Sequence, residues 1–245
     1  MDRTRNSILQ TSKCTTALWK KYQSGITPVI PDIKCKSPGE GDLMRGRNPV
    51  ELAKVLSSAG APVISVVTES EHYGGSLELL QQIADAVPVP VLRKDFIKNK
   101  QQLQESADYG ASGVLLISSI MDKETLHNLI EEALLLGLEP LVETHNEDEI
   151  LAIKGAQVTF LGINNRNILQ WEMDDGNVNR TENLARFVPP NTLVLSESSI
   201  SSSADVVRAT SAGAHAVLVG TTILQAENPV DMFNELSVPR EQSLA

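Results

Sequence analysis

Several kinds of residue are scarce in this 245-residue chain, and each scarcity narrows what the protein is. Aromatic residues make up only 4% of the chain while hydrophobic residues make up 41%, so we expect a sizeable core built mainly from aliphatic side chains. The 21 basic residues are outnumbered by 31 acidic ones, which gives a formal net charge of -10. A general nucleic-acid binder needs a basic face to displace counterions from phosphates. This class is therefore disfavoured, and any anionic ligand must be held by a local cluster.

The chain also lacks a cysteine framework and long hydrophobic runs. Its two cysteines, Cys14 and Cys35, have neither the spacing of metal ligands nor a surrounding disulfide scaffold, so we interpret them as reduced thiols. Residues 1–14 lack the apolar stretch of a signal peptide, and no run approaches the roughly 18 apolar residues of a membrane span. These absences predict a cytoplasmic protein with no membrane partner.

Short hydrophobic runs alternate with longer amphipathic segments along most of the chain. The runs predicted to be strands are residues 27–33, 62–68, 90–94, 113–118, 140–144, 160–164, 192–197 and 216–220. They are continuous rather than alternating in polarity, as is typical of parallel strands buried on both faces. Segments with helical periodicity lie between them at residues 49–60, 76–87, 100–110, 123–137 and 204–213. Several of these segments end at a glycine suited to a helix C-cap.

Eight such units in a chain of this length predict an α/β fold, the (β/α)₈ TIM barrel. A doubly wound open sheet is the alternative, but it usually carries a Gly-rich fingerprint after its first strand, and none is present here. We assign residues 27–245 to one barrel domain. Residues 1–26 contain a weakly amphipathic segment, so we assign them to a short N-terminal helical extension that caps one end of the barrel.

Ionisable and polar residues gather where the predicted strands end. Asp32 and Lys34 lie two residues apart at the end of the first strand, so their side chains point to the same face. Comparable groups follow four other strands, namely Lys94, Asp95, Glu143, Asn164, Arg166, Glu197 and Ser198. In a barrel these strand ends form the face that carries the active site. Burying opposite charges together there shifts their pKa values and prepares them for proton transfer.

Small and hydroxylated residues follow the last two strands. Residues 196–203 read SESSISSS, and in the stretch GTTILQ at 220–225 Thr221 fits the start of a short helix. In many barrels the loops after strands seven and eight, together with such a helix N-terminus, bind a phosphate through backbone N–H groups. An ordinary capped helix fits the same residues about equally well. From these residues alone both interpretations stay open.

Several motifs together resemble the indole-3-glycerol phosphate synthase family of tryptophan biosynthesis. The motifs are DIKCKSP at 32–38, TESEHYGGS at 68–76, PVLRKDFI at 90–97, GASGVLLI at 110–117, LVETHNEDE at 141–149, LGINNRN at 161–167, LVLSES at 193–198 and AVLVGT at 216–221. The resemblance runs from about Pro28 to Leu224. It implies a carboxy-lyase that closes the pyrrole ring of 1-(2-carboxyphenylamino)-1-deoxyribulose 5-phosphate, with loss of carbon dioxide and water, to give indole-3-glycerol phosphate.

The resemblance also implies a role for each catalytic residue. Lys94 lies at the family's general-acid position, and Lys34 matches the lysine that pairs with the substrate's carboxylate. Glu143 matches the glutamate of the dehydration step, and Asp32 completes the group. We further expect the two lysines to lower each other's pKa, which would make the ammonium a better acid. No metal ion or organic cofactor is implied, so side chains must do all the proton transfer.

Other matched positions are implied to hold the substrate. Asn164 and Glu197 would orient its hydroxyl groups and the lysines, while Phe96 and Tyr73 would pack on its anthranilate ring. The implied phosphate-binding residues are Ser37, Arg166, Ser198, Ser199, Gly220 and Thr221. The expected partner is therefore a phosphorylated small molecule, and we expect a monomer or a weak homodimer.

Three departures from the family pattern keep alternatives open. Asp32 stands where better-known members carry Glu, Ser199 stands where Gly usually follows Glu-Ser, and the N-terminal segment does not clearly match the helix that covers the site in relatives. One alternative is therefore a non-catalytic or regulatory barrel that binds a phosphorylated ligand. The other is a phosphoribosyl-isomerase-like enzyme, which commonly uses paired aspartates at strands one and five. Here the second position is Glu143, and Lys34 and Lys94 would have no obvious duty.

Overall fold

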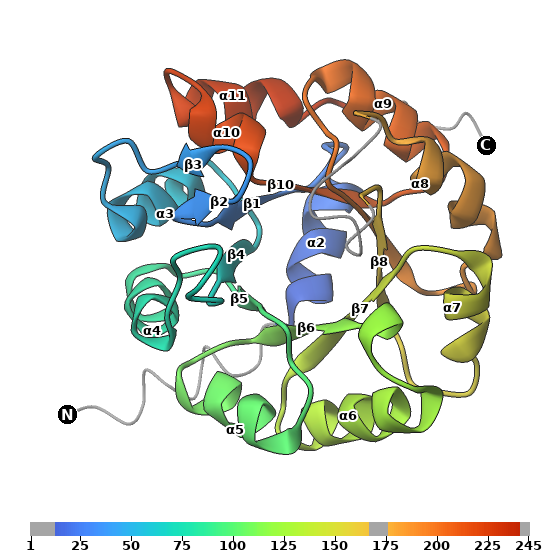
Figure 1. The fold of residues 1–245 in the computed structure, drawn as a ribbon. Helices are drawn as coiled ribbons and strands as arrows, with labels where there is room; N and C mark the ends of the chain where they lie inside the picture. The colour runs from blue at the N-terminus through green and yellow to red at the C-terminus, as the bar shows by residue number, and fades with distance from the viewer. Residues whose placement is uncertain (1–12, 167–175, 241–245) are drawn as a thin grey trace.

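Eight parallel strands close into a barrel in the computed structural model, which describes residues 13–166 and 176–240. Around the barrel the strands follow the order β1-β10-β9-β8-β7-β6-β5-β4 (Figure 1). They are β1 Val29–Ile33, β4 Ile64–Val67, β5 Val91–Lys94, β6 Gly113–Ile117, β7 Glu139–Thr144, β8 Phe160–Asn164, β9 Leu193–Glu197 and β10 Ala216–Val219. Each strand coincides with a predicted run to within two residues at either end, and the (β/α)₈ barrel is confirmed.

The longer helices surround the barrel and match the predicted segments. They are α3 Pro49–Ser58, α4 Leu77–Ala86, α5 Lys100–Asp108, α6 Lys123–Leu135 and α9 Ser203–Ser211. The residue before each helix caps it, because an Asn, Asp or Ser side chain there accepts a backbone N–H of the first turn. The glycines after four of these helices, Gly60, Gly110, Gly137 and Gly213, have φ between 79° and 111°, which only glycine adopts without strain.

Shorter helices complete the connections. They are α7 Glu147–Ala152, α8 Asn179–Leu184, α10 Thr221–Gln225, α11 Pro229–Leu236, and the 3₁₀ turns η1 Ser118–Ile120 and η3 Ala185–Phe187. The sequence patterns predicted only the start of α10 at Thr221. The others are too short to show helical periodicity over a useful window. None of the described helices has the length and hydrophobicity that crossing a lipid bilayer requires.

The core has two parts, as expected for a closed barrel. One lies between the strands and the surrounding helices, and includes strand residues such as Val29 and Val66 and helix residues such as Leu52. The other fills the barrel interior with mostly aliphatic side chains, including Leu92 and Leu141. Both parts are packed mainly from aliphatic side chains, as the low aromatic content of the chain predicts.

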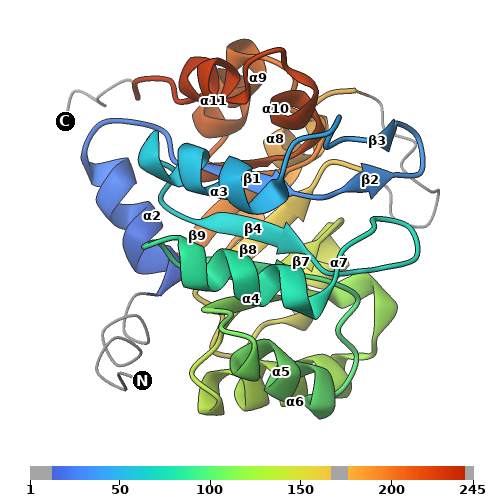
Figure 2. The same ribbon diagram turned by 90° about the vertical axis from the view of Figure 1, so that its left-hand side faces the viewer.

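Helix α2 Cys14–Gln23 seals the end of the barrel where the strands begin. Its residues Cys14 and Leu18 belong to the interior cluster, and Thr15 donates hydrogen bonds to the carboxylate of Glu139, the first residue of β7. Figure 2 shows α2 at the end from which the arrows of β1 and β4 point away. The predicted N-terminal helix thus caps the barrel opposite the ends of the strands.

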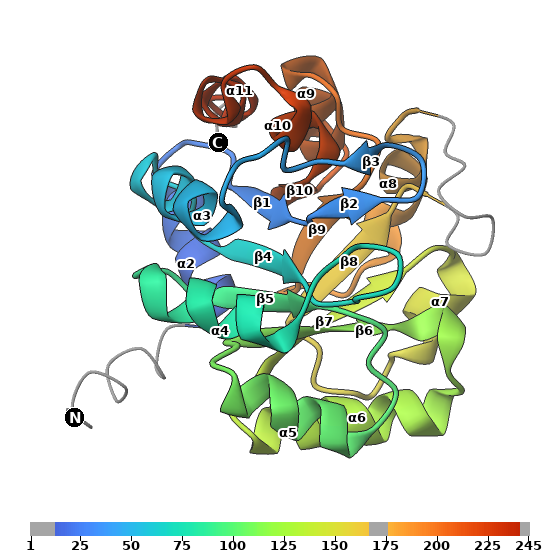
Figure 3. The ribbon, with the colours of Figure 1, turned by 60° about the vertical axis from the view of Figure 1, so that its left-hand side comes forward.

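A short hairpin rises beyond the end of β1 (Figure 3). It consists of the antiparallel strands β2 Lys36–Ser37 and β3 Gly41–Asp42. After it, Arg45 donates to the carbonyl oxygen of Gln225 at 3.0 Å, and Arg47 donates to the carbonyl oxygens of Leu43 and Leu224. These bonds fasten the loop after β1 to helix α10 on the same rim.

Candidate active site

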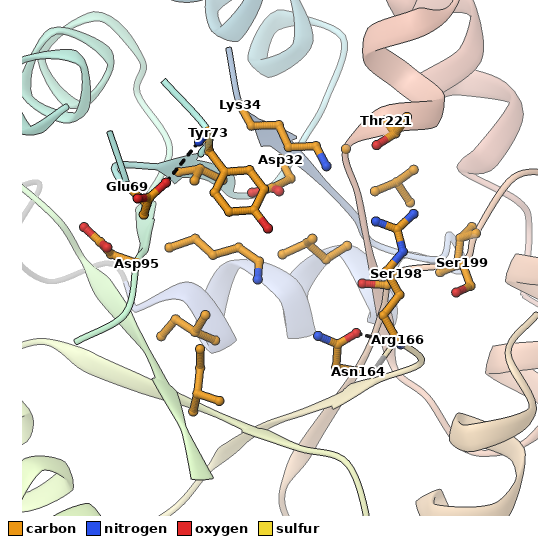
Figure 4. A pocket seen from close by; sticks show the side chains of 18 of the residues that line it. Asp32, Lys34, Glu69, Tyr73, Asp95, Asn164, Arg166, Ser198, Ser199 and Thr221 are labelled. Atoms are coloured by element: carbon orange, nitrogen blue, oxygen red, sulfur yellow. Dashed lines mark hydrogen bonds between the residues drawn. The ribbon is translucent and has the colours of Figure 1, made fainter. Parts of the chain in front are cut away.

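A cavity of about 700 Å³ lies at the end of the barrel where the strands finish. All the predicted site residues except Glu143, Glu197 and Ser37 line it. Figure 4 shows Arg166, Ser198, Ser199 and Thr221 on one side of this space, and Glu69, Tyr73 and Asp95 on the other, with Asp32 and Lys34 between the two. Among the described residues, the cavity lining includes the cationic side chains of Lys34, Lys94, Lys98 and Arg166.

Lys94 stands at the centre of a three-strand charge cluster. Its Nζ lies 3.5 Å from Oε2 of Glu143 on β7 and 3.8 Å from Oε2 of Glu197 on β9. The side chains of the two glutamates are 0% and 1% exposed, while that of Lys94 is 22% exposed. The carboxylates therefore lie beneath the lysine, and the lysine is the member of the cluster that faces the cavity.

The carboxylates around Lys94 set its charge. Burial alone would lower the pKa of Lys94, but the negative charges of Glu143, Glu197 and Asp32 outweigh this effect and raise the pKa above its ordinary value. Our expectation that Lys94 would have a lowered pKa because of a second lysine is therefore wrong. Its neighbours are mainly acidic, so the ammonium form is stabilised.

The two glutamates beneath Lys94 differ from each other. Burial raises the pKa of Glu197, and the charges of Glu143 and Asp32 raise it further. Burial also acts to raise the pKa of Glu143, but Lys94 and then His145 outweigh it, so the pKa of Glu143 lies below its ordinary value. Two carboxyl groups whose pKa values are pushed apart can take separate acid and base roles.

Asp32 is buried at the cavity edge and is held from the neighbouring strand. Ser65 of β4 donates a hydrogen bond to Oδ1 of Asp32 at 2.6 Å. On the other side, a Cβ at Gly220 would lie 3.3 Å from the Cβ and the carbonyl oxygen of Asp32. The absence of a side chain at Gly220 therefore leaves room for Asp32 between β4 and β10.

The aromatic side of the cavity is shaped by the loop after β4. Glu69 accepts the backbone N–H groups of His72 and Tyr73 at 2.7 and 3.0 Å, and this places the Tyr73 ring 5.9 Å from Nζ of Lys34 (Figure 4). Glu69, Glu71 and His72 also have possible metal-ligand atoms within 4.8 Å of one another. The backbone hydrogen bonds of Glu69 already account for its position, so we interpret this group as a loop anchor. Asp95, which also lines the cavity, is paired with Arg93 at 2.9 Å.

The opposite side of the cavity carries the small residues expected to hold phosphate. Ser198 and Ser199 have φ values of 67° and 58°, in the left-handed region that glycine favours. Thr221 begins α10, and Arg166 is placed by the bond from its N–H to Oδ1 of Asn164 at 3.0 Å. Ser37 does not line the cavity and lies in strand β2 of the hairpin. Its side chain is buried, and within the described residues its Oγ has no hydrogen-bond partner.

A family model described as indole-3-glycerol phosphate synthase matches residues 2–236 of this chain. The chain belongs to the indole-3-glycerol phosphate synthase family. The match to the indole-3-glycerol phosphate synthase model is wider than the stretch from Pro28 to Leu224 that carries the motifs, and it includes most of the N-terminal segment.

Similar proteins named indole-3-glycerol phosphate synthase occur in archaea and bacteria. The one from Pyrococcus furiosus is 43% identical over 209 residues, covering 85% of this chain and 90% of the relative. The one from Thermococcus kodakarensis is 40% identical over 208 residues, with 85% and 91% covered. The one from Koribacter versatilis is 38% identical over 224 residues, with 90% and 84% covered. The chain thus spans most of the length of each of these indole-3-glycerol phosphate synthases.

Sequence reasoning missed two residues that position the site in this indole-3-glycerol phosphate synthase family member. A Cβ at Gly162, within β8, would collide with Oε1 of Glu197, so the missing side chain gives that carboxylate its place. A glycine inside a strand signals such a close approach, and LGIN carried this signal. Asn165 donates to the carbonyl oxygens of Glu197 and Ser198 at 3.0 and 3.2 Å, which fixes the end of β9.

Proposed function

We propose that this chain closes the pyrrole ring of 1-(2-carboxyphenylamino)-1-deoxyribulose 5-phosphate, releasing carbon dioxide and water, to form indole-3-glycerol phosphate. Membership of the family supports this reaction, and the observation that carries it in the structure is the cluster of Lys94 over Glu143 and Glu197. The cluster presents one ammonium to the cavity above two buried carboxyl groups of different pKa. Such a group can give and take protons in sequence at one place.

In the first step Lys94 is the proposed general acid. Its raised pKa keeps it in the ammonium form at neutral pH, ready to protonate the substrate's ketone oxygen as the aromatic carbon attacks the carbonyl carbon. The oxygen becomes strongly basic as the carbon–carbon bond forms, so transfer from an ammonium is favourable. Lys34, which lines the same cavity, is proposed to pair with the substrate's carboxylate until it leaves as carbon dioxide.

The later dehydration needs both a base and an acid. Glu143, whose pKa is lowered, is ionised and suits the base that removes a proton from the ring. Glu197, whose pKa is raised, holds a proton near Lys94 and can support its reprotonation. We propose that Asn164 orients the substrate's hydroxyl groups from the cavity wall, together with Glu197, and that Asp32 is a further catalytic group at the cavity edge.

The two sides of the cavity suit the two ends of this substrate. Phe96 and Tyr73 are proposed to pack on its anthranilate ring. At the other end, the proposed phosphate-binding groups are Arg166, Ser198, Ser199, Gly220 and Thr221. A role for Ser37, the cytoplasmic location and the monomeric or weakly dimeric state stay predictions from the sequence.

The product assay tests the function directly. Purified protein given the carboxyphenylamino deoxyribulose phosphate should produce indole fluorescence, and Lys94→Ala should lose about 10²- to 10⁴-fold in kcat, as removal of a general acid does. Wild-type protein that gives no more product than Lys94→Ala would contradict the proposal.

A non-catalytic phosphate-binding barrel is the second candidate, because Asp32 and Ser199 depart from the family pattern. It predicts tight binding of the same substrate without turnover. In that case Asp32→Glu would show whether one shortened carboxylate is responsible, since restored turnover would mean that only this group had been lost. The isomerase alternative is weaker, because Glu143 stands where the second aspartate would be needed and the ion pair of Lys94 with Glu143 would have no evident role.

A further inference from the structure

The two carboxyl groups beneath Lys94 begin from nearly equal positions. Glu143 and Glu197 are both buried, and both place one oxygen within 4 Å of the same Nζ, at 3.5 and 3.8 Å. Within the described residues, no oxygen of either side chain has a hydrogen-bond partner. The proposed mechanism nevertheless needs one of them to be an ionised base. Some other group must therefore distinguish the two.

His145 contacts one of these glutamates and lies directly after β7. Its Nε2 is 3.4 Å from Oε1 of Glu143, the oxygen that does not face Lys94. Its Nδ1 is 3.1 Å from Oε2 of Glu149 on α7. The imidazole is only 10% exposed, so these contacts lie in a largely desolvated place. No corresponding ion pair reaches Glu197 from His145 among the described residues.

Glu149 holds the imidazole in this orientation. Its Oε2 accepts the backbone N–H of His145 at 2.8 Å and the hydroxyl of Ser118 at 2.6 Å, and its Oε1 accepts the side-chain amide of Asn146 at 2.7 Å. Ser118 is shared, because its hydroxyl also lies 2.7 Å from the carbonyl oxygen of Glu143. The strand end, the 3₁₀ turn η1 and helix α7 together fix the ring between two carboxylates.

We propose that His145 is a positioning residue that makes Glu143, and not Glu197, the ionised base of the buried pair. This rests on the proposed function. An imidazolium between Glu143 and Glu149 stabilises negative charge on Glu143 from the side away from Lys94. Lys94 acts on both glutamates, and the charge of His145 reaches both as well. Among the described residues the imidazole directly contacts only Glu143 of the two, at 3.4 Å, so His145 adds to the difference between them.

The charges that face this network agree with the proposal. The groups acting on His145 are Glu143 and Glu149, and together they raise its pKa to about 9 although burial alone would lower it. Lys94 from β5 acts on both glutamates, Asn164 from β8 acts on Glu143, and Asp32 from β1 and His145 act on Glu197. His145 is thus protonated at neutral pH with a carboxylate at each ring nitrogen.

Carboxyl ¹³C NMR on the ligand-free, full-length protein tests the proposal without depending on turnover. Protein labelled at the glutamate carboxyl carbon is titrated, and Glu143→Gln and Glu197→Gln variants identify the two signals. In His145→Gln we expect the midpoint of Glu143 to rise by about one to three pH units, the effect of losing an opposite charge at this range. The signals of Glu143 and Glu197 should then titrate closer together.

A pH profile of kcat/KM provides the second measurement. In His145→Gln the acidic limb should move to higher pH, and activity should recover toward the wild-type value as the pH is raised and Glu143 ionises. A residue with only a structural role would lower activity at every pH without moving the limb. Glu149→Gln should give a smaller shift in the same direction, because it weakens the protonation of His145.

His127→Gln is the matched control, since the Nε2 of His127 is 2.9 Å from a backbone carbonyl oxygen, that of Ala152, and among the described residues His127 forms no ion pair with a carboxylate. It should leave both the Glu143 midpoint and the pH limb where they are. An unchanged Glu143 midpoint in His145→Gln would overturn the proposal for His145 even if the enzyme is active. An inactive wild-type protein with a shifted midpoint would instead overturn the proposed function and leave the charge assignment standing.

Discussion

Strand β7 carries two buried glutamates four residues apart, one at each end of the barrel. Glu139 lies at the sealed end, where its carboxyl group accepts the backbone N–H of Thr15 at 2.9 Å and the hydroxyl of Thr15 at 2.5 Å. Glu143 lies beneath the cavity, where within the described residues neither of its oxygens accepts a hydrogen bond. The two residues share a strand, a side-chain type and almost complete burial. They differ in whether their hydrogen bonds are satisfied.

This difference in hydrogen bonding suggests that Glu139 contributes to the stability of the fold and that Glu143 takes part in proton transfer. A buried carboxyl group with its hydrogen bonds made adds to the stability of the fold, whereas one left without them costs free energy of folding. Glu143 is held instead by Lys94 and His145, at 3.5 and 3.4 Å, and ion pairs of this kind leave its oxygens able to exchange protons. The missing hydrogen bonds of Glu143 therefore agree with its proposed role as the base.

The largest expected effect on kcat comes from replacing one of the two glutamates, Glu143, by glutamine and comparing it with the same replacement of Glu139. Glu143→Gln should lower kcat by about 10²- to 10⁴-fold, because it removes the proposed base. It should change the free energy of unfolding little, since Lys94 still has Glu197 and His145 still has Glu149. Glu139→Gln should do the reverse, leaving kcat unchanged while losing about 1–3 kcal/mol of stability. Urea unfolding beside a turnover assay checks both, and equal stability losses in the two variants would break the comparison.

Glycines at the two ends sharpen the same contrast. Gly162→Ala should push the flexible end of Glu197 away from Lys94, and a displacement of about 1 Å should cost roughly 10²-fold in kcat. Gly113→Ala places its Cβ 2.8 Å from the backbone carbonyl oxygen of Glu139, which cannot easily move. We therefore expect this variant to lose stability and keep its kcat once folded. Thermal unfolding and initial rates measured on both variants would show whether the two losses separate in this way.

At the cavity end, the stability of the protein should depend on pH through the charge of His145. The pKa of His145 is raised from its ordinary 6.5 to about 9, so its favourable contribution is complete below about pH 6.5 and is lost as the pH rises through about 9. We compare two proteins that both carry Glu197→Gln, so that the titration of Glu197 does not contribute; one of them also carries His145→Gln. The free energy of unfolding should be higher in the protein that keeps His145, and this difference should be about 1–3 kcal/mol larger at low pH than at high pH. A gap that does not narrow with rising pH would argue against an imidazolium.

The smallest expected effect lies at the phosphate side of the cavity. Ser199 has a φ of 58°, a conformation that costs a non-glycine residue about 1 kcal/mol or more. Ser199→Gly should therefore stabilise the protein by about 1 kcal/mol and tighten the binding of a phosphate ligand. Calorimetric titration with inorganic phosphate and thermal unfolding measure the two effects. Ser201→Gly in the same loop is a matched control, because Ser201 has no positive φ.

The barrel and the membership of its rim could be predicted from the sequence. Each strand is an uninterrupted apolar run, and polar residues such as Lys94 and Asn164 stand at its end, so order along the chain and fold class are enough to gather them. The short helices α7 and α8 were missed because six residues carry too little periodicity to predict a helix.

The electrostatics of the site could not be predicted in the same way. Lys94 was expected to have a lowered pKa, and the reverse holds because two carboxyl groups from distant strands lie beneath it. His145 stands in a recognised motif, yet its contact with Glu143 depends on the chain turning out of β7 after Thr144. Sequence order shows which groups are neighbours on the rim. It does not show the distances that decide which of them carries a proton.

The cationic side chains that line the cavity, including those of Lys34, Lys94, Lys98 and Arg166, lie in a chain whose formal net charge is -10. A doubly anionic ligand approaching from solution therefore meets the repulsive average field of the whole molecule first. It meets attraction only within roughly one Debye length of the rim, about 10 Å at 0.1 M salt. Added salt should thus speed the arrival of such a ligand while weakening its hold once bound. Encounter and retention are governed by charges of opposite sign in the same protein.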